Sequence, residues 1–244
     1  MTSPSNDNAR PLVGRVALVT GASRGIGAAV ALRLAEAGAH IIAVARTTGG
    51  LEALDDRIKA LGSTATLVPF DIKDGAAIDR LGAAVMERWK KLDILVGNAG
   101  MLGMLGPIGH MKPKMWDDVL AVNLTANWRL IRSFDPLLRA SDAGRVIFVT
   151  SSVGREHRAY WGAYAVSKAA LEHMARIYAA EVAKTNVRVN LINPGGTRTA
   201  MRAQAMPGED PQTVKAPEDV AELFLKLALP ACTANGEVFD YRAR

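Results

Sequence analysis

The sequence predicts a single α/β domain in which a doubly wound parallel sheet of about seven strands has helices on both faces. Short β-branched runs alternate with longer segments of helical spacing from residue 15 onward. The short runs are almost continuously apolar, as strands covered on both faces must be. Aromatic residues make up only 5% of the chain while alanine and glycine are plentiful, which suits helices packed closely on a sheet.

The alternating segments give the order of the elements. Strand, helix, strand repeats are joined by right-handed crossovers within one parallel sheet. Pro217 suits a first helical turn, and Glu218 and Asp219 suit the positive end of the helix dipole, so a last helix is expected at 217–228. The other helices are expected at residues 26–37, 51–61, 76–89, 115–138 and 164–184, and the strands at 16–19, 41–44, 66–68, 94–96, 146–149, 187–192 and 237–240.

No low-complexity linker and no repeat of 20–50 residues divides the chain. We therefore expect one domain over residues 12–244, preceded by a flexible polar leader, residues 1–11. The leader lacks the apolar core of a signal peptide, and no run of about 18 apolar residues is present to span a membrane. These features predict a cytoplasmic protein without a membrane partner.

The composition narrows the partners further. The formal net charge is +6, but the lysines and arginines are scattered without a block of five or six, so we expect no nucleic-acid partner. Cys232 is the only cysteine, which excludes an intrachain disulfide and a zinc site built from cysteines. We expect no metal site. A modest positive charge suits an enzyme that holds a phosphate-bearing cofactor.

A glycine-rich turn follows the first expected strand. Gly21, Gly25 and Gly27 stand in the segment TGASRGIG, and a helix opens at Ile26. Small residues let the backbone approach a pyrophosphate, and the free N–H groups and dipole of the helix N-terminus attract it. Three glycines alone would also fit a plain tight turn, but their place between a strand and a helix favours phosphate binding.

The end of the second expected strand indicates which dinucleotide binds. An acid here would accept hydrogen bonds from the ribose of NAD, but the segment IIAVARTT has none, and the next acid is Glu52. Arg46, with Arg24 of the glycine turn, can instead hold the 2′-phosphate of NADP through charge-assisted hydrogen bonds. The alternative is that either arginine is a solvated surface residue. The missing carboxylate favours NADP(H), with NAD(H) as the second candidate.

Ser151, Tyr164 and Lys168 form the candidate catalytic group. Tyr164 and Lys168 are four residues apart on an expected helix, so their side chains share one face. A free phenol has a pKa of about 10, and a nearby ammonium group favours the phenolate and would lower that pKa toward neutrality. Ser151, at the end of a strand, can polarise a substrate carbonyl. The Tyr–Lys pair alone would also fit an amphipathic surface stripe.

Together these motifs resemble, in order and spacing, those of the short-chain dehydrogenase/reductase family over nearly the whole chain after residue 12. The family's TGxxxGxG corresponds to residues 20–27, its NAG to 98–100 and its YxxxK to 164–168. The family usually places a serine 13 residues before the tyrosine, which selects Ser151 over Ser152. The resemblance implies a Rossmann-like fold and an NAD(P)-dependent oxidoreductase acting on CH–OH or C=O groups.

The resemblance also implies roles for the matching residues. Tyr164 would donate the proton while the nicotinamide donates hydride, Lys168 would hold the nicotinamide ribose and tune Tyr164, and Asn123 would anchor a relay water. Asp71 matches an aspartate that contacts adenine, although it also fits a helix cap. The residues expected to contact the cofactor are Gly21, Ser23, Arg24, Gly25, Ile26, Gly27, Arg46, Asp71, Ile72, Asn98, Ala99, Gly100, Tyr164, Lys168, Pro194, Gly195, Thr197 and Thr199.

Two departures from the family pattern carry expectations of their own. Gly97 stands where the family usually has the first asparagine of NNAG, so we expect altered local packing but no loss of cofactor binding. The chain lacks the glycine-rich tail that the family often has after the last strand, which puts the tetramer contacts of that tail in doubt. A homodimer made by long helices or a homotetramer is expected.

Residues 199–215 fall where the family has its substrate lid. The segment contains Met201 and Met206 and shows no sustained helical spacing, so we expect it to open and close over the cleft. His157 is expected to be a loop residue near the cleft mouth rather than a general base. Trp161 is expected either to line the substrate cleft or to pack at the start of a helix.

The sequence therefore predicts an NADP(H)-preferring oxidoreductase that transfers hydride between nicotinamide and a small-molecule carbonyl or alcohol substrate. The alternative is a redox-silent NADP-binding regulatory protein, because the fold alone does not separate the two. The intact set of Ser151, Tyr164 and Lys168 favours the enzyme, since a sensor needs no acid beside the nicotinamide.

Overall fold

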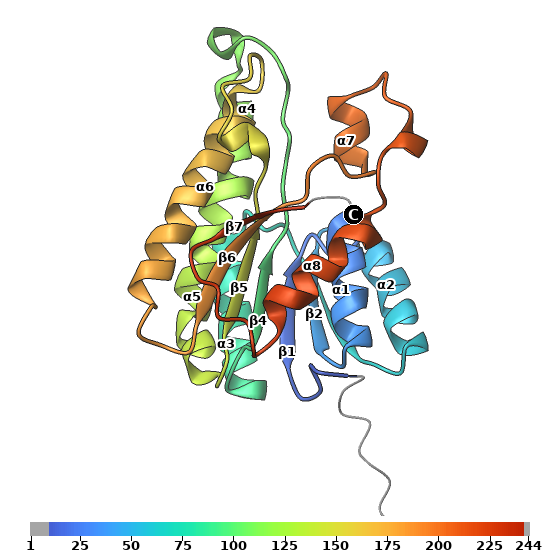
Figure 1. Ribbon diagram of the computed structural model, residues 1–244, viewed down its shortest axis with the longest axis vertical. Helices are drawn as coiled ribbons and strands as arrows, with labels where there is room; N and C mark the ends of the chain where they lie inside the picture. The colour runs from blue at the N-terminus through green and yellow to red at the C-terminus, as the bar shows by residue number, and fades with distance from the viewer. Residues whose placement is uncertain (1–9, 242–244) are drawn as a thin grey trace, which may run out of the picture.

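In the computed structural model, which describes residues 10–241, seven parallel strands form one sheet in the order β3-β2-β1-β4-β5-β6-β7 (Figure 1). This confirms the predicted fold class. Most of the predicted leader lies outside the described residues; within them, Leu12 is already fully buried. The strands are β1 (Val16–Thr20), β2 (His40–Ala45), β3 (Ala65–Pro69), β4 (Ile94–Gly97), β5 (Arg145–Val149), β6 (Arg188–Asn193) and β7 (Val238–Asp240).

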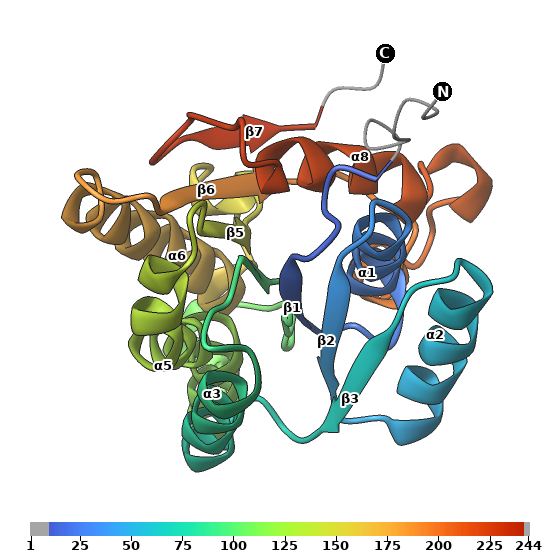
Figure 2. The ribbon, with the colours of Figure 1, turned by 90° about the horizontal axis from the view of Figure 1, so that it is seen from below.

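Helices cover both faces of the sheet (Figure 2). One face carries α1 (Gly25–Glu36), α2 (Thr48–Ala60) and α8 (Pro217–Ala228). The other carries α3 (Gly75–Trp89), α5 (Ala126–Ala140) and α6 (Gly162–Glu181), while α4 (Pro113–Leu120) leads into α5. A short helix, α7 (Ala200–Ala205), lies apart from these layers, beyond the carboxyl ends of the strands (Figure 1).

Each strand contributes to two hydrophobic cores. In β1, Ala17 and Val19 belong to the core shared with α1 and α8, whereas Val16 and Leu18 belong to the core shared with α3 and α5. All five residues of β1 are buried, which is why its sequence shows no alternation of polar and apolar positions. No helix within residues 10–241 is both long and apolar enough to span a membrane.

The helix expected at 115–138 is continuous but not uniform. Between α4 and α5 the chain forms a π-helical turn, η3 (Ala121–Thr125). Such single turns occur often at functional sites, because the extra residue redirects the side chains that follow. Asn123 lies within this turn and is fully buried. The hydrophobic pattern predicts the helix but carries no signal for the π turn.

The strand order reverses between β1 and β4, where parallel α/β sheets open a crevice at the carboxyl ends of their strands. The glycine-rich turn follows β1, and residues 98–100 follow β4 on the other side of the reversal. Ser151 follows β5 and Pro194 follows β6. The topology thus brings all the predicted motifs to one edge of the sheet.

Candidate active site

A cleft of about 1210 Å³ opens at the carboxyl ends of the strands, between the strand ends and the α7 segment. Pockets for small ligands measure roughly 300–1,000 Å³, so this cleft has room for a dinucleotide together with a second small molecule. All of the predicted site residues line it except Gly27 and Asn123, which lie behind its wall. Residues 10–241 contain no cluster of acidic, histidine or cysteine side chains arranged to hold a metal ion.

The glycine turn at the end of β1 is shaped to hold a pyrophosphate. Gly21 and Gly25 have φ values of +66° and +57°, which glycine adopts without strain. A Cβ on Gly27 would collide with the carbonyl oxygen of Gly21, so only glycine lets α1 start this close to the turn. Arg24 makes no side-chain capping bond, and the first turn of α1 has no acid. The helix N-terminus therefore offers its N–H groups to an anion.

Thr20 joins the two strand ends on either side of the crevice. Its Oγ1 accepts hydrogen bonds from the backbone N–H groups of Asn98 and Ala99, both at 3.0 Å. The Asn98 amide in turn donates to the carbonyl of Thr20 at 2.8 Å. These bonds fix the loop after β4 against the glycine turn. Thr20 belongs to the TGxxxGxG motif, but sequence analysis did not assign it a role.

The end of β2 presents cations without acids. Arg24 and Arg46 are both exposed and line the cleft, and within residues 10–241 neither pairs with a carboxylate. Asp71 also lines the cleft, but α3 is capped by Asp74, whose carboxylate accepts from the N–H of Ala77 at 2.9 Å. The alternative reading of Asp71 as the helix cap is therefore wrong. Ile72 is buried against the cleft wall.

The candidate catalytic residues Ser151, Tyr164 and Lys168 line the wall of the cleft that is formed by α6 and the end of β5. Tyr164 is buried, and the ammonium nitrogen of Lys168 lies 5.6 Å from the centre of its ring. Lys168 Nζ donates to the carbonyl of Val149 at 2.7 Å, which places it against the end of β5. Burial lowers the pKa of Lys168 to about 8. Ser151 stands directly beyond β5, on the same side of the cleft.

Burial raises the pKa of Tyr164 to about 12, while a hydrogen bond with Ser151 acts in the opposite direction. This direction is opposite to the expectation that Lys168 lowers the pKa of Tyr164. Desolvation of the phenolate is the larger effect, and the Lys168 ammonium group is engaged with Val149 instead of the phenol. The consequence is a phenol that stays protonated at neutral pH.

Asn123 braces the cleft from behind. Its side-chain oxygen accepts from the N–H of Met101 at 2.8 Å, and its amide donates to the carbonyl of Met101 and to Ser167 Oγ, both at 2.9 Å. Ser167 Oγ then donates to the carbonyl of Tyr164 at 2.7 Å. Through these bonds the π turn holds the loop after β4 at a fixed distance from the first turn of α6.

A buried acid supports the segment that carries Ser151. Glu172 accepts a hydrogen bond from Thr150 Oγ1 at 2.8 Å, and the guanidinium of Arg155 lies 3.5 Å from the same oxygen. Sequence analysis missed Glu172, although it stands four residues after Lys168 and so on the same face of α6. Thr150 and Ser151 are thus positioned from α6 as well as from β5.

The packing around position 97 explains why a glycine stands there. A Cβ at this position would collide with the ring of Phe148, which is fully buried in β5, and with Oδ1 of Asn127. The space that a side chain at 97 needs is therefore occupied by its neighbours. Asn127 is itself held by a bond from its amide to the carbonyl of Asn123 at 2.8 Å.

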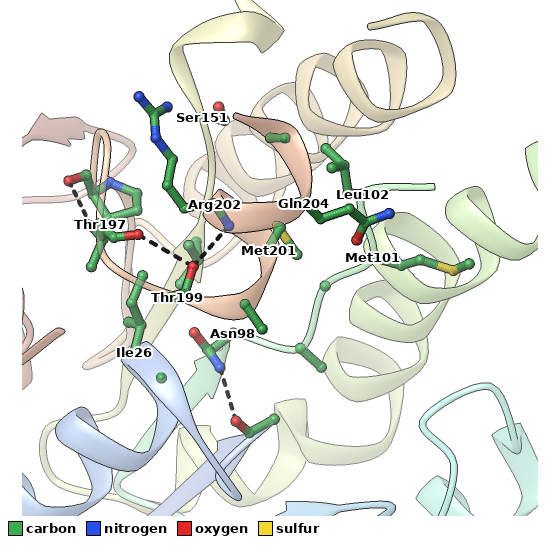
Figure 3. Close-up of a pocket in the computed structure, with 18 of the residues that line it drawn as sticks. Ile26, Asn98, Met101, Leu102, Ser151, Thr197, Thr199, Met201, Arg202 and Gln204 are labelled. Atoms are coloured by element: carbon green, nitrogen blue, oxygen red, sulfur yellow. Dashed lines mark hydrogen bonds between the residues drawn. The ribbon is translucent and has the colours of Figure 1, made fainter. Parts of the chain in front are cut away.

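The lid segment is more ordered in structure than its sequence suggests. Helix α7 occupies part of this segment, whose sequence shows no sustained helical spacing. Thr199 caps α7 by accepting from the N–H of Arg202 at 3.2 Å, and the Arg202 guanidinium donates two hydrogen bonds to Glu209. Six residues are too few to show a helical period. In Figure 3, Met201 and Gln204 of α7 face the loop with Leu102.

The sequence profile of the family described as short chain dehydrogenase matches residues 15–210. The chain belongs to the short-chain dehydrogenase family. This short-chain dehydrogenase is 42% identical over 216 residues to the uncharacterized oxidoreductase YciK of Escherichia coli, covering 87% of this chain and 85% of that protein. This chain is an NAD(P)-dependent oxidoreductase with a Rossmann-like fold.

Two solved structures of relatives contain cofactor. A short chain dehydrogenase of Shigella flexneri complexed with NADP superposes with a TM-score of 0.91 at 40% identity, covering 95% of this chain and 98% of that one. A short chain dehydrogenase of Escherichia coli CFT073 complexed with NADPH gives the same TM-score and identity, covering 97% and 99%.

Proposed function

We propose that this short-chain dehydrogenase prefers NADP(H) and transfers hydride between nicotinamide and a small-molecule carbonyl or alcohol substrate, with Tyr164 as the acid. The observation that carries the proposal is a protonated, buried phenol in the cleft beside Ser151 and Lys168. A group of this kind can give a proton to a carbonyl oxygen as that oxygen gains negative charge.

The cofactor fits the residues at the other end of the cleft. The α1 N-terminus and the glycine turn would hold the pyrophosphate, and Arg24 and Arg46 would hold the 2′-phosphate. No acid stands at the end of β2 to accept bonds from a free ribose hydroxyl or to repel that phosphate. The relatives complexed with NADP and NADPH support the same preference. NAD(H) would bind through the same turn, but more weakly.

The residues around Tyr164 have separate tasks in this proposal. Bound nicotinamide supplies or accepts the hydride. Ser151 donates a hydrogen bond to the substrate oxygen and orients it toward the Tyr164 hydroxyl. Lys168, once released from Val149 or sharing its protons with it, favours the phenolate that remains after the proton has moved. Asn123 keeps the Met101 loop in place and, we propose, connects Tyr164 to a relay water.

A redox-silent NADP-binding regulator is the weaker candidate. Such a protein would need the glycine turn and Arg46, but not a buried tyrosine held next to an open cleft. Burial lowers the pKa of Lys168 and raises the pKa of Tyr164, and such perturbed groups in a cleft are typical of catalytic sites.

We propose that the enzyme acts in the cytoplasm as a homodimer or homotetramer.

The test is NADPH oxidation across a panel of neutral ketones and aldehydes, with NADH measured alongside. We expect turnover with at least one member of the panel, a higher kcat/KM with NADPH, and loss of turnover in Tyr164→Phe. Binding of NADPH without turnover of any carbonyl or alcohol would favour the regulator.

We also propose that residues 199–215 close over bound substrate. The segment donates one hydrogen bond to the opposite wall, from Gln204 to the carbonyl of Gly103 at 3.2 Å, and Met201 and Ala205 pack against the apolar cluster around Tyr164. Hydrogen exchange should show protection of residues 200–214 that increases from the free protein to the ternary complex. Uniformly strong protection in the free protein would contradict a lid, and would shift attention to residues 155–160 as the specificity loop.

A further inference from the structure

We propose that the substrate carries an anionic group, a carboxylate or a phosphate, and that Arg158 at the mouth of the cleft binds it. This inference rests on the proposed carbonyl chemistry at Tyr164 and adds which carbonyl compounds the site selects. It follows from the contrast between the inner wall of the substrate region and its rim.

The inner wall beside Tyr164 is apolar. Leu102 and Val153 are buried against Tyr164, and Trp161, Met201 and Ala205 pack on the same cluster. Apart from the reacting groups and the indole N–H of Trp161, the side chains of this cluster are apolar. The part of the substrate next to its carbonyl must therefore be apolar.

The polar side chains of the lid are already engaged. The guanidinium of Arg202 donates to both oxygens of Glu209, which neutralises each charge. Gln204 donates to the carbonyl of Gly103, and Lys215 Nζ donates to the carbonyl of Gly196 at 2.6 Å. An anionic group on the substrate would gain little from these residues without first breaking their bonds.

Arg158 differs from them. It lines the same cleft, and within residues 10–241 it has no carboxylate partner, although Glu156 stands two residues before it. The other arginine of this loop, Arg155, is taken by ion pairs with Asp240 and Glu172. Arg158 is therefore the cation that this loop leaves for a ligand.

The position of Arg158 is fixed by aromatic contacts. Its guanidinium carbon lies 5.0 Å from the centre of the Trp161 ring, and that ring lies 6.0 Å from the ring of Tyr164. Cation, indole and phenol thus follow one another from the rim to the reacting hydroxyl. Arg158 is exposed, so this stacking restrains the geometry of its guanidinium without removing it from solvent, and a restrained guanidinium is better placed for a charge-assisted bond to an anion.

The charges that line the cleft favour the same class of substrate. Its carboxylates are Asp71, at the adenosine end, and Glu209, which Arg202 neutralises. The cofactor phosphates would use the cations at the glycine turn and at the end of β2. Arg158 and Arg198 both line the cleft without a carboxylate partner in the part of the chain that the structure describes. Of the two, it is Arg158 that connects to Tyr164 through Trp161, so the potential there attracts an anion.

The test compares three para-substituted acetophenones that differ in charge: 4-acetylbenzamide, 4-acetylbenzoate and 4-acetylphenyl phosphate. With NADPH and the wild-type enzyme, we expect kcat/KM for at least one anion to exceed that for the amide by about tenfold, the size of one charge-assisted bond. Arg158→Gln should bring the ratio close to one, and Arg158→Lys should restore part of it. Which anion gains more distinguishes a carboxylate from a phosphate substrate.

Arg57→Gln is the matched control, because Arg57 is an exposed arginine on α2, outside the cleft. The substitution removes the same charge as Arg158→Gln. It should leave the ratio unchanged. Calorimetry of the three compounds with the NADP-bound enzyme gives a readout independent of turnover. Equal binding of amide and anions, or an anion preference that survives Arg158→Gln, overturns the inference. Reduction of neutral ketones alone would leave the proposed function standing while this inference fails. Selective binding of an anion without any reduction would do the reverse.

Discussion

Charged side chains at the two ends of the sheet differ in whether they have partners within the protein. At the amino ends of the strands, the fully buried carboxylate of Asp93 accepts from the N–H of Val16 at 2.8 Å and from Arg15, Lys91 and Ser141. At the same end, Arg145 donates to four backbone carbonyls. At the carboxyl ends, Arg24, Arg46 and Arg158 line the cleft without a carboxylate partner among residues 10–241.

The paired charges at the amino ends therefore contribute to the stability of the fold, whereas the charges at the carboxyl ends are available to bind a ligand. Charges that satisfy one another hold the fold together, because a buried ion left without its partner is costly. Charges without protein partners stabilise nothing until a ligand arrives. Changes at the amino end should therefore alter unfolding, and changes at the carboxyl end should alter binding or turnover. Tyr164 and Lys168 are the exception, because they are buried as well as reactive.

Tyr164→Phe should give the largest effect. Removing the proton donor is expected to lower kcat at least about a hundredfold, the typical contribution of a general acid. NADPH affinity, measured by fluorescence titration, should change little, because the phosphates are held elsewhere in the cleft. A variant that keeps more than about a tenth of the wild-type rate, a barrier change under about 1.4 kcal/mol, would show that Tyr164 is not the main proton donor.

Asp93→Asn tests the opposite end. The free energy of unfolding should fall by about 3 kcal/mol, because Arg15 and Lys91 lose a buried counter-ion. Activity of the remaining folded protein should be unchanged. Asp142→Asn is the matched control: Asp142 also pairs with Arg15, but its side chain is 72% exposed, so the loss should stay below about 1 kcal/mol. Equal losses in urea unfolding would remove the distinction between the two acids.

Lys168 should link stability to pH. Its pKa in the folded protein is about 8, below the usual 10.5, so between these values the unfolded chain binds a proton that the folded protein has released. Wild-type stability should therefore rise with pH across this window relative to Lys168→Met, by up to about 3 kcal/mol in total. Urea unfolding of both proteins from about pH 7 to pH 9 measures the first part of this rise, below the pKa of about 10 at which tyrosines of the unfolded chain lose their protons. Parallel curves would mean that Lys168 is not desolvated as the structure indicates.

Arg46→Ala should have the smallest effect of the four. We expect it to weaken NADPH binding about tenfold and NADH binding hardly at all, because the exposed guanidinium contacts only the 2′-phosphate. Ala45→Asp should shift the preference further toward NADH, since the new carboxylate repels the phosphate and accepts from a ribose hydroxyl. Titration of both cofactors decides the matter: equal losses for the two would show that Arg46 does not recognise the phosphate.

The sequence predicted what depends on periodicity and on contiguous motifs. The strands, the doubly wound parallel sheet and the helices on both of its faces follow from such local patterns. The π turn at Asn123 did not, because one extra residue within a long helix changes the spacing of its apolar residues too little to be recognised. The protonated state of Tyr164 did not either, because it depends on burial by segments distant in sequence. Arg158 carries no signal of its own: only the fold shows that its neighbour Arg155 is paired and that it is not.

Because the Phe148 ring occupies the space beside Gly97 on the adjacent strand, the sizes of the residues at these two positions depend on each other. A side chain at 97 collides with Phe148 and with Asn127 unless both give way, so position 97 cannot change first. A smaller residue at 148 causes no collision, but it leaves a cavity in the core. Directed evolution that samples single substitutions can therefore reach a side chain at 97 only after positions 148 and 127 have changed, and a library that varies the three positions together reaches the alternative packing directly.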